Sequence, residues 1–430
     1  MAGILLTHAP AAARAQGVAP PAIIPQPVAV TSGTGQFAVT AATVIWTDRA
    51  STTLGRQLAD YLAPATGLAP AVRTGGPPAG SRIVLRRDTS LARLGPEGYR
   101  LEVSAERVLA RAPEPAGLFY AVQTIRQLLP PAIFRAAPVP GVPWTIPSLT
   151  VEDYPRFRWR GAHLDVCRHF MPKEFVKKYI DLLALHKLNS FHWHLTDDQG
   201  WRIEIRKYPR LTTVGGWRAQ TLVGLQTDDT THRVFDGERH GGFYTQDDVR
   251  EIVAYAKARF VNVVPEIEMP GHSQAAIAAY PFLGNTGDSL TVLTVWGVSE
   301  NILYPGDSTL AFMRDVLTEV LELFPGPFIH IGGDEAVKTQ WKASARVQAR
   351  LRELGVANEE ELQSWFIRQM DAFLTGRGRR LVGWDEILEG GLAPNATVMS
   401  WRGTEGGIAA ARAGHDVVMT PGSHTYFDHY

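Results

Sequence analysis

Residues 328–335 read Phe-Ile-His-Ile-Gly-Gly-Asp-Glu, an apolar run that leads into two glycines and then two adjacent acids. The glycines allow the backbone to turn tightly or to approach a ligand closely. Asp334 and Glu335 repel each other near a buried strand end, so the pKa of one of them is expected to rise. A carboxylic acid that stays protonated near neutral pH can act as a general acid. The same pair also suits a helix N-terminus with a surface ion pair, so the segment alone leaves both interpretations open.

On both sides of this segment, short apolar runs with β-type residues alternate with stretches of helical periodicity, which predicts a parallel sheet. The runs are residues 159–166, 190–195, 261–267, 328–331, 381–384, 397–401 and 416–419. The helical stretches are residues 174–185, 247–259, 309–323, 360–374 and 404–413.

Charged or aromatic residues follow the end of every run: Arg168, His169, Asp197, Asp198, Glu266, Glu268, His272, Asp334, Glu335, Trp384, Asp385, Trp401, Arg402, Tyr426 and Asp428. A (β/α)8 barrel gathers all its strand ends around one mouth, whereas a doubly wound sheet gathers only those at its switch point. We therefore expect an α/β fold with a (β/α)8 TIM-type barrel. The sequence stops at Tyr430, soon after the seventh run. We expect this barrel to lack its last strand and helix, with truncation as the favoured reason.

We assign residues 149–430 to the catalytic barrel and residues 20–148 to a small α/β domain that precedes it. Four prolines in residues 138–147 predict a linker between the two, since proline cannot donate to a helix or ladder. The small domain shows no polar cluster, so we expect it to have a supporting role. Residues 1–19 are expected to be a leader or a residual signal. A periplasmic or secreted location is favoured, and a cytoplasmic one stays open.

The composition limits the classes of partner. Lysine plus arginine and aspartate plus glutamate balance at 43 each. Nucleic acids and anionic membranes require a basic excess, so neither is expected as the main partner. No apolar run is long enough to span a bilayer. Cys167 is the single cysteine, and its place at the end of an apolar run favours a buried structural thiol over a nucleophile.

A metal-dependent hydrolase is the rival hypothesis. His192 and His194 are two apart in a predicted strand, so both imidazoles point the same way and could share a metal, with His272, His330 and an acid completing the ligand set. However, these histidines precede their strand ends, where histidines buried in a barrel core fit equally well.

Several motifs, in order, resemble family 20 glycoside hydrolases, the β-N-acetylhexosaminidases, from about Tyr154 to the end. They are Arg160-Gly161, Leu164-Asp165-Val166-Cys167-Arg168-His169-Phe170, the segment 192–201 (HWHLTDDQGW), the segment 265–272 (PEIEMPGH), His330-Ile331-Gly332-Gly333-Asp334-Glu335, Gly383-Trp384-Asp385-Glu386, Ser400-Trp401-Arg402-Gly403 and Tyr426-Phe427-Asp428. The preceding segment is similar to the small α/β domain that often comes before the barrel in this family.

The resemblance implies an exo-acting, retaining enzyme that removes terminal N-acetylglucosamine or N-acetylgalactosamine by substrate-assisted catalysis, with no metal or organic cofactor. It implies that Glu335 is the general acid and base, and that Asp334 holds the substrate's acetamido N–H. The remaining implied roles belong to Arg168 (ring hydroxyls), Asp197 and His272 (support of the acid), Trp384 and Trp401 (acetamido pocket), Tyr426 (acetamido oxygen) and Asp428 (a distal hydroxyl).

The expected partner is an amino-sugar oligosaccharide or glycoconjugate. Family members carry a further tryptophan and glutamate on the last barrel strand, and this sequence has no counterpart to them. A catalytically impaired sugar-binding scaffold is therefore an alternative hypothesis. The preference between gluco and galacto sugars and the oligomeric state stay open.

Overall fold

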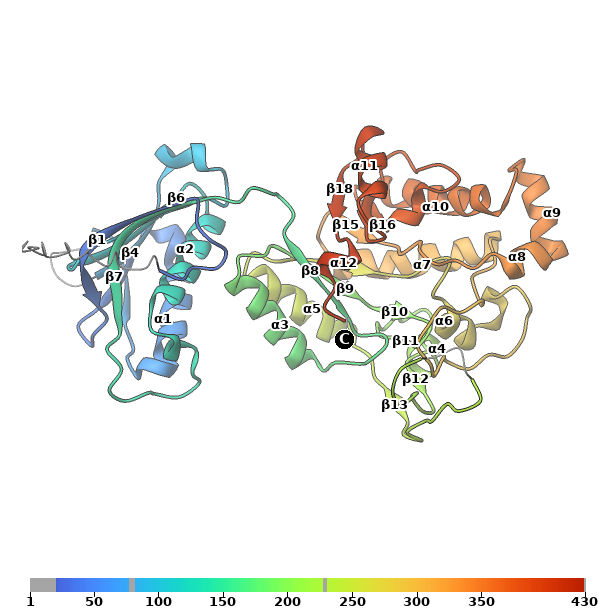
Figure 1. Ribbon diagram of the computed structural model, residues 1–430, viewed down its shortest axis with the longest axis horizontal. Coiled ribbons are helices and arrows are strands. Elements are labelled where there is room, and N and C mark those ends of the chain that lie inside the picture. The colour runs from blue at the N-terminus through green and yellow to red at the C-terminus, as the bar shows by residue number, and fades with distance from the viewer. Residues whose placement is uncertain (1–20, 77–81, 227–229, 429–430) are drawn as a thin grey trace, which may run out of the picture. The chain divides into compact units, whose positions relative to one another are not determined.

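The computed structural model describes residues 21–76, 82–226 and 230–428, which form two compact units that meet in sequence between Arg156 and Phe157. Each unit has its own sheet (Figure 1). The expected leader, residues 1–19, lies outside the described residues.

The first unit is a mixed seven-stranded sheet in the order β1-β7-β5-β6-β4-β2-β3, with two helices packed on one face (Figure 1). Alternate residues of its strands face these helices, as in β5, where Tyr99, Leu101 and Val103 are buried. The elements are β1 (Ala29–Ala38), β2 (Val44–Thr47), α1 (Thr52–Thr66), β3 (Ala71–Thr74), β4 (Arg82–Arg87), β5 (Tyr99–Val103), β6 (Arg107–Ala112), α2 (Pro115–Leu128) and β7 (Thr145–Asp153).

Strand β7 places the boundary of the first unit later than the proline pattern indicates. It pairs antiparallel with both β1 and β5, so the end of the expected linker and residue 148 lie inside this strand. Pro147 is exposed and pairs with Gln36 beside an irregularity in the register of β1. A proline is tolerated at such a site, where the ladder is already interrupted. The boundary therefore follows residue 156.

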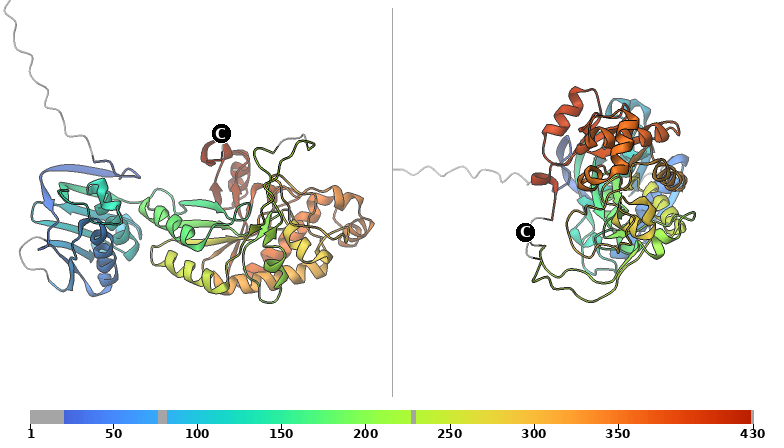
Figure 2. Two further views of the ribbon diagram at one scale, coloured as in Figure 1. Left: turned by 90° about the horizontal axis from the view of Figure 1, so that it is seen from below. Right: turned by 90° about the vertical axis from the view of Figure 1, so that its right-hand side faces the viewer.

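The second unit is a parallel seven-stranded sheet in the order β18-β17-β16-β15-β14-β9-β8. Its strands are β8 (Gly161–Asp165), β9 (Ser190–His194), β14 (Asn262–Glu266), β15 (Phe328–His330), β16 (Arg380–Trp384), β17 (Thr397–Ser400) and β18 (Val417–Met419). All seven predicted strands are confirmed. Within the described residues, β8 and β18 are the outermost strands of this sheet and do not pair with each other. The sheet is curved, and its seven strands form part of a TIM-type barrel (Figure 2).

Helices follow the strands and pack on the outer side of this sheet (Figures 1 and 2). Successive helices also contact one another, α3 with α5, α5 with α7, and α7 with α10. The bounds are α3 (Lys173–Leu185), α5 (Gln246–Lys257), α7 (Asp307–Leu323), α10 (Glu359–Thr375) and α11 (Glu405–Arg412). No helix in the described residues has both the length and the apolar character to cross a membrane.

Helix α2 can approach the sheet of the first unit because residue 117 lacks a side chain. A Cβ atom on Gly117 would collide with the carbonyl oxygen of Gly98 and crowd the Cβ atom of Ala112. The obstacle is backbone, so it cannot move aside as a flexible side chain would. The contact between α2 and strands β5 and β6 therefore depends on this glycine.

Replacing Gly117 with alanine is expected to lower the free energy of unfolding of the first unit by about 1–3 kcal/mol, as overpacking does. Urea denaturation followed by circular dichroism measures the change. Gly76→Ala is the matched control, because a Cβ atom there meets nothing within 4 Å. Equal stabilities of the two variants would contradict the close packing of α2.

Candidate active site

The two glycines after β15 bring the acid pair to the mouth of the sheet. Gly332 and Gly333 have positive φ angles of 69° and 92°. A Cβ atom on Gly332 would collide with the Glu268 carboxylate, so only glycine fits there. Glu335 also has a positive φ angle, 44°, a conformation that is strained for a residue with a long side chain.

His272 connects the acid pair to a second pair of acids behind it. Its Nε2 atom lies 3.4 Å from Asp334 Oδ2 and 3.3 Å from Glu335 Oε2. Its Nδ1 atom lies 3.3 Å from Asp197 Oδ1 and 3.2 Å from Asp198 Oδ2. Burial alone would lower the pKa of His272, but the negative charges of Asp197 and Asp334 outweigh it and raise that pKa well above its usual range.

The charge of His272 acts back on the carboxylate that faces it. The hydrogen bond from His272 lowers the pKa of Glu335, although partial burial opposes the shift. About a third of the Glu335 side chain, 37%, remains exposed, so the carboxylate is open to an incoming molecule. These opposite shifts favour the proton of the pair on the imidazole, so the pKa of Glu335 falls where repulsion between the adjacent acids alone would raise the pKa of one of them.

Arg168 is the last of a series of alternating charges that runs from Glu335 through His272 and Asp197. Its Nη1 atom lies 2.7 Å from Asp197 Oδ2 and 3.2 Å from Asp165 Oδ2. Burial would raise the pKa of Asp197, but the positive charges of Arg168 and then His272 lower it below its usual range. The guanidinium group of Arg168 also lies over the ring of Trp296, 5.2 Å from its centroid.

On the other side of the acid pair, Asp334 faces aromatic residues. Its Oδ1 atom is buried and has no hydrogen-bond partner in the described part of the chain. Burial, followed by the negative charges of Asp334 and Glu266, raises the pKa of Tyr426 above its usual range. The ring of Trp401 lies nearly parallel to that of Tyr426, with centroids 6.4 Å apart. An unsatisfied buried acceptor beside aromatic walls suits a donor on a ligand.

Trp384 is buried, with its indole N–H directed inward at Glu266 Oε1, 2.7 Å away. Asp428 is exposed and makes no hydrogen bond within the described residues. The structure thus gathers Asp334, Glu335, His272, Asp197 and Arg168 directly, with Tyr426 and Trp401 beside them.

Glu386, which the sequence analysis named only as part of a motif and gave no role, is a further member of this site. It belongs to the turn after β16, and its oxygens accept hydrogen bonds from Trp401 Nε1 at 3.0 and 3.2 Å. Burial, followed by the charge of Asp334, raises its pKa to about 7. Its position two residues after Trp384 at a strand end is the signal that could have indicated it.

The two histidines of the metal hypothesis do point the same way, and they share a carboxylate. His192 Nε2 lies 2.8 Å and His194 Nδ1 lies 3.7 Å from Glu266 Oε2. His330 Nδ1 lies 2.9 Å from the other oxygen of Glu266. Burial lowers the pKa of His192 to about 3, so it serves as a neutral hydrogen-bonding group. This network accounts for both histidines as structural groups within the sheet.

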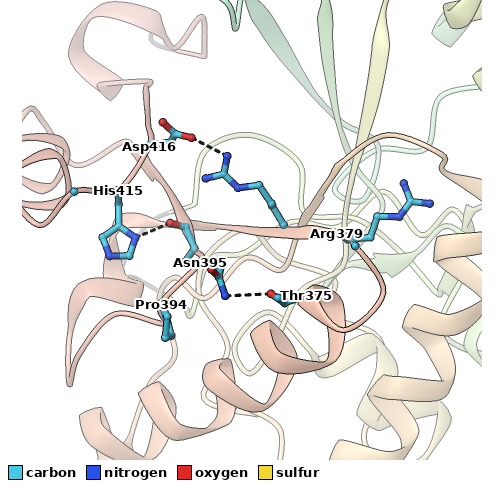
Figure 3. Close-up of a pocket in the computed structure, with 10 residues that line it drawn as sticks. Thr375, Arg379, Pro394, Asn395, His415 and Asp416 are labelled. Carbon is cyan, nitrogen blue, oxygen red and sulfur yellow. Dashed lines mark hydrogen bonds and ion pairs between the residues drawn. The ribbon is translucent and has the colours of Figure 1, made fainter.

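A cavity of about 420 Å³ lies at the opposite end of the strands, among residues that precede β16, β17 and β18 (Figure 3). It is held by the contacts of His415 Nδ1 with the Ala396 carbonyl, at 2.9 Å, and of Arg380 with Asp416, at 2.7 Å. None of the predicted site residues lines it. In barrels, polar groups at the amino-terminal face serve stability, so the site is the carboxylate cluster.

Two family models match the chain, and their limits follow the two units. Residues 157–430 match the catalytic domain of glycosyl hydrolase family 20, and residues 20–154 match domain 2 of the same family. Among solved structures, a β-N-acetylhexosaminidase from Streptomyces coelicolor is 38% identical with a TM-score of 0.79, covering 94% of this chain and 76% of that one. The Streptomyces plicatus enzyme in complex with Thio-NAglucal is 36% identical with a TM-score of 0.80, covering 94% and 75%.

A curated relative from Porphyromonas gingivalis, named Beta-hexosaminidase, is 47% identical over 95% of this chain and 51% of its own length. Another from Vibrio furnissii, with the same name, is 40% identical over 80% of this chain and 54% of its own length. The chain thus spans about half the length of these relatives. With a catalytic-domain match over its whole second unit and the acid pair of that unit at the mouth of a TIM-type sheet, the chain belongs to glycosyl hydrolase family 20.

Proposed function

We propose that this chain carries the site of an exo-acting, retaining β-N-acetylhexosaminidase. The substrate is a terminal N-acetylglucosamine or N-acetylgalactosamine residue of an oligosaccharide or glycoconjugate. The observation that carries the proposal is the buried Oδ1 atom of Asp334, which has no hydrogen-bond partner within the described residues, while the carboxylates of Asp334 and Glu335 both approach His272. The names of the hexosaminidase relatives support it.

In this proposal the nucleophile belongs to the substrate. The acetamido N–H donates to Asp334, which turns the acetamido oxygen toward the anomeric carbon. Tyr426 donates its hydroxyl hydrogen to that oxygen. Attack closes an oxazolinium ring, and the carboxylate of Asp334 stabilises the positive charge that develops there. Trp384 and Trp401 wall the pocket around the methyl group. Two inversions at one carbon give net retention.

Glu335 moves the proton in both steps. It protonates the departing glycosidic oxygen and later removes a proton from the water that opens the ring. His272 shares a proton with Glu335 through its Nε2 atom in both steps, while Asp197 orients the imidazole through its Nδ1 atom. Arg168, held by Asp165 and Asp197, grips ring hydroxyls, and Asp428 contacts a distal hydroxyl.

Replacing Glu335 with glutamine is expected to lower kcat on a disaccharide by about 10²–10⁴-fold, because the enzyme then lacks a general acid to protonate the leaving oxygen. The loss is expected to be smaller on a nitrophenyl glycoside, because that leaving group needs less protonation. Glu353→Gln, an exposed acid on helix α9 (Ala345–Leu354), is the control and should retain full activity. Near-native turnover of the disaccharide by the Glu335 variant would contradict the assignment.

The acetamido group of the substrate is expected to be essential. The enzyme should release nitrophenol from an N-acetylglucosaminide and very little from a plain glucoside, because only the former carries the nucleophile. Asp334→Asn should remove most of this activity, since its amide no longer provides a carboxylate for the N–H and the developing charge. Initial rates on the two glycosides test this, and equal rates would refute substrate assistance.

The pH dependence of kcat/KM is expected to report the proton shared by Glu335 and His272. The raised pKa of His272 means that the pair keeps one proton until the pH exceeds about 6.5, so the alkaline limb should lie above that value. In His272→Gln the proton resides on Glu335 alone, so the limb should move to lower pH. Thermal melts confirm that the variant is folded, and an unchanged limb would rule out the shared proton.

A further inference from the structure

Helices α1 and α2 cover one face of the sheet of the first unit, and within the described residues no helix covers the other face (Figure 1). Three residues in neighbouring register form an apolar row on this open face. Trp46 of β2 pairs with Val84 of β4, and Val84 pairs with Leu109 of β6. Their neighbours Ile45, Ile83 and Val108 are buried on the helix-covered side, as strand alternation requires.

Arginines surround this row. Arg82 and Arg107 are register partners on one side, and Arg86 and Arg111 are register partners on the other. Arg73 of β3 pairs with Trp46 at the end of the row. Five guanidinium groups thus lie on one open face around an apolar centre.

Several of these charges are not compensated within the described residues. Arg73, Arg86 and Arg107 are exposed, and their side chains make no hydrogen bond, ion pair or ring contact there. Arg111 pairs with Asp88 and Glu102 at 3.0 and 3.1 Å, but its Nε atom is buried without an acceptor.

The nearby acid Asp48 is already committed to the backbone. It accepts hydrogen bonds from the amides of Ser51 and Arg87, at 2.8 and 2.6 Å. Asp48 therefore forms no ion pair with Arg86 or Arg107, and in the described part of the chain only Arg111 of the arginines that line the cavity is paired with acids.

Three of the five arginines, Arg86, Arg107 and Arg111, line a cavity of about 320 Å³ together with Val84, Leu109 and the acidic residue Asp48. From Arg107 to Arg86 the groove follows β4 and β6 for about four residues, roughly 13 Å at the usual rise of a strand. This length accommodates two to three pyranose rings.

We propose that this groove binds an acidic glycan chain that carries uronic-acid carboxylates. A guanidinium group presents two parallel N–H donors that match a carboxylate, which favours this anion over a point-like one. The apolar faces of the pyranose rings rest on Val84 and Leu109, the members of the apolar row that line the cavity. The site lies in the first unit and uses no residue of the carboxylate cluster, so it stands independently of the proposed hydrolysis.

The test uses the full chain and a tetrasaccharide of alternating glucuronic acid and N-acetylglucosamine. Glucuronic acid stands at its non-reducing end, so the probe offers no terminal amino sugar to an exo-acting site. Isothermal titration calorimetry compares the native chain with R86Q/R107Q. Arg56→Gln, which removes an exposed arginine on α1, is the control for the loss of a surface charge away from the groove. Neutral chitotetraose serves as the uncharged probe.

The double variant is expected to bind the acidic probe at least about tenfold more weakly, with unchanged melting temperature and unchanged turnover of a nitrophenyl substrate. Arg56→Gln should bind the acidic probe as tightly as the native chain does. The heat of chitotetraose binding should be the same for the native chain and for R86Q/R107Q. The absence of binding to the native chain would overturn the proposal. So would an equal loss in Arg56→Gln, which would mean that net charge alone attracts the probe.

Discussion

One buried imidazole, that of His272, holds the carboxylate cluster together. Four carboxylates approach its two nitrogens, from Asp197, Asp198, Asp334 and Glu335. These like charges repel one another, and each buried carboxylate without a positive partner also costs several kcal/mol of desolvation free energy. The imidazolium and the Arg168 guanidinium offset that repulsion. The positive φ angles of His272 and Glu335 are maintained by the same contacts, as is usual for strained residues at functional sites.

A second buried network, centred on the Glu266 carboxylate, lies inside the parallel sheet and holds Trp384 in position. Its two oxygens contact His192 of β9, His330 of β15 and Trp384 of β16, so one carboxylate joins strands from across the sheet. Because Trp384 donates its only polar hydrogen to this network, its ring cannot turn freely. The position of the Trp384 ring is therefore set by a hydrogen bond inside the sheet, which under the proposed function would make the acetamido pocket preorganised.

The seven strands and their order along the chain could be predicted from the sequence because their apolar runs are local patterns. The pairing of β7 could not, since the proline at residue 147 signals a linker until the irregular register of β1 is known. Motifs placed Asp334 and Glu335 together, and the structure adds their shared contact with His272. The raised pKa of Glu386 and the inward turn of Trp384 arise from tertiary burial, which no local pattern encodes.

The central claim is that Asp334 receives the acetamido N–H while Glu335 faces the leaving oxygen. A crystal structure of the chain with a mimic whose acetamido group is already closed onto the anomeric carbon tests it most directly. The account predicts that the ring nitrogen lies about 2.7–3.0 Å from Asp334 Oδ1, within hydrogen-bond range. A mimic bound with that nitrogen directed away from Asp334, or bound outside the walls of Trp384 and Trp401, would contradict it.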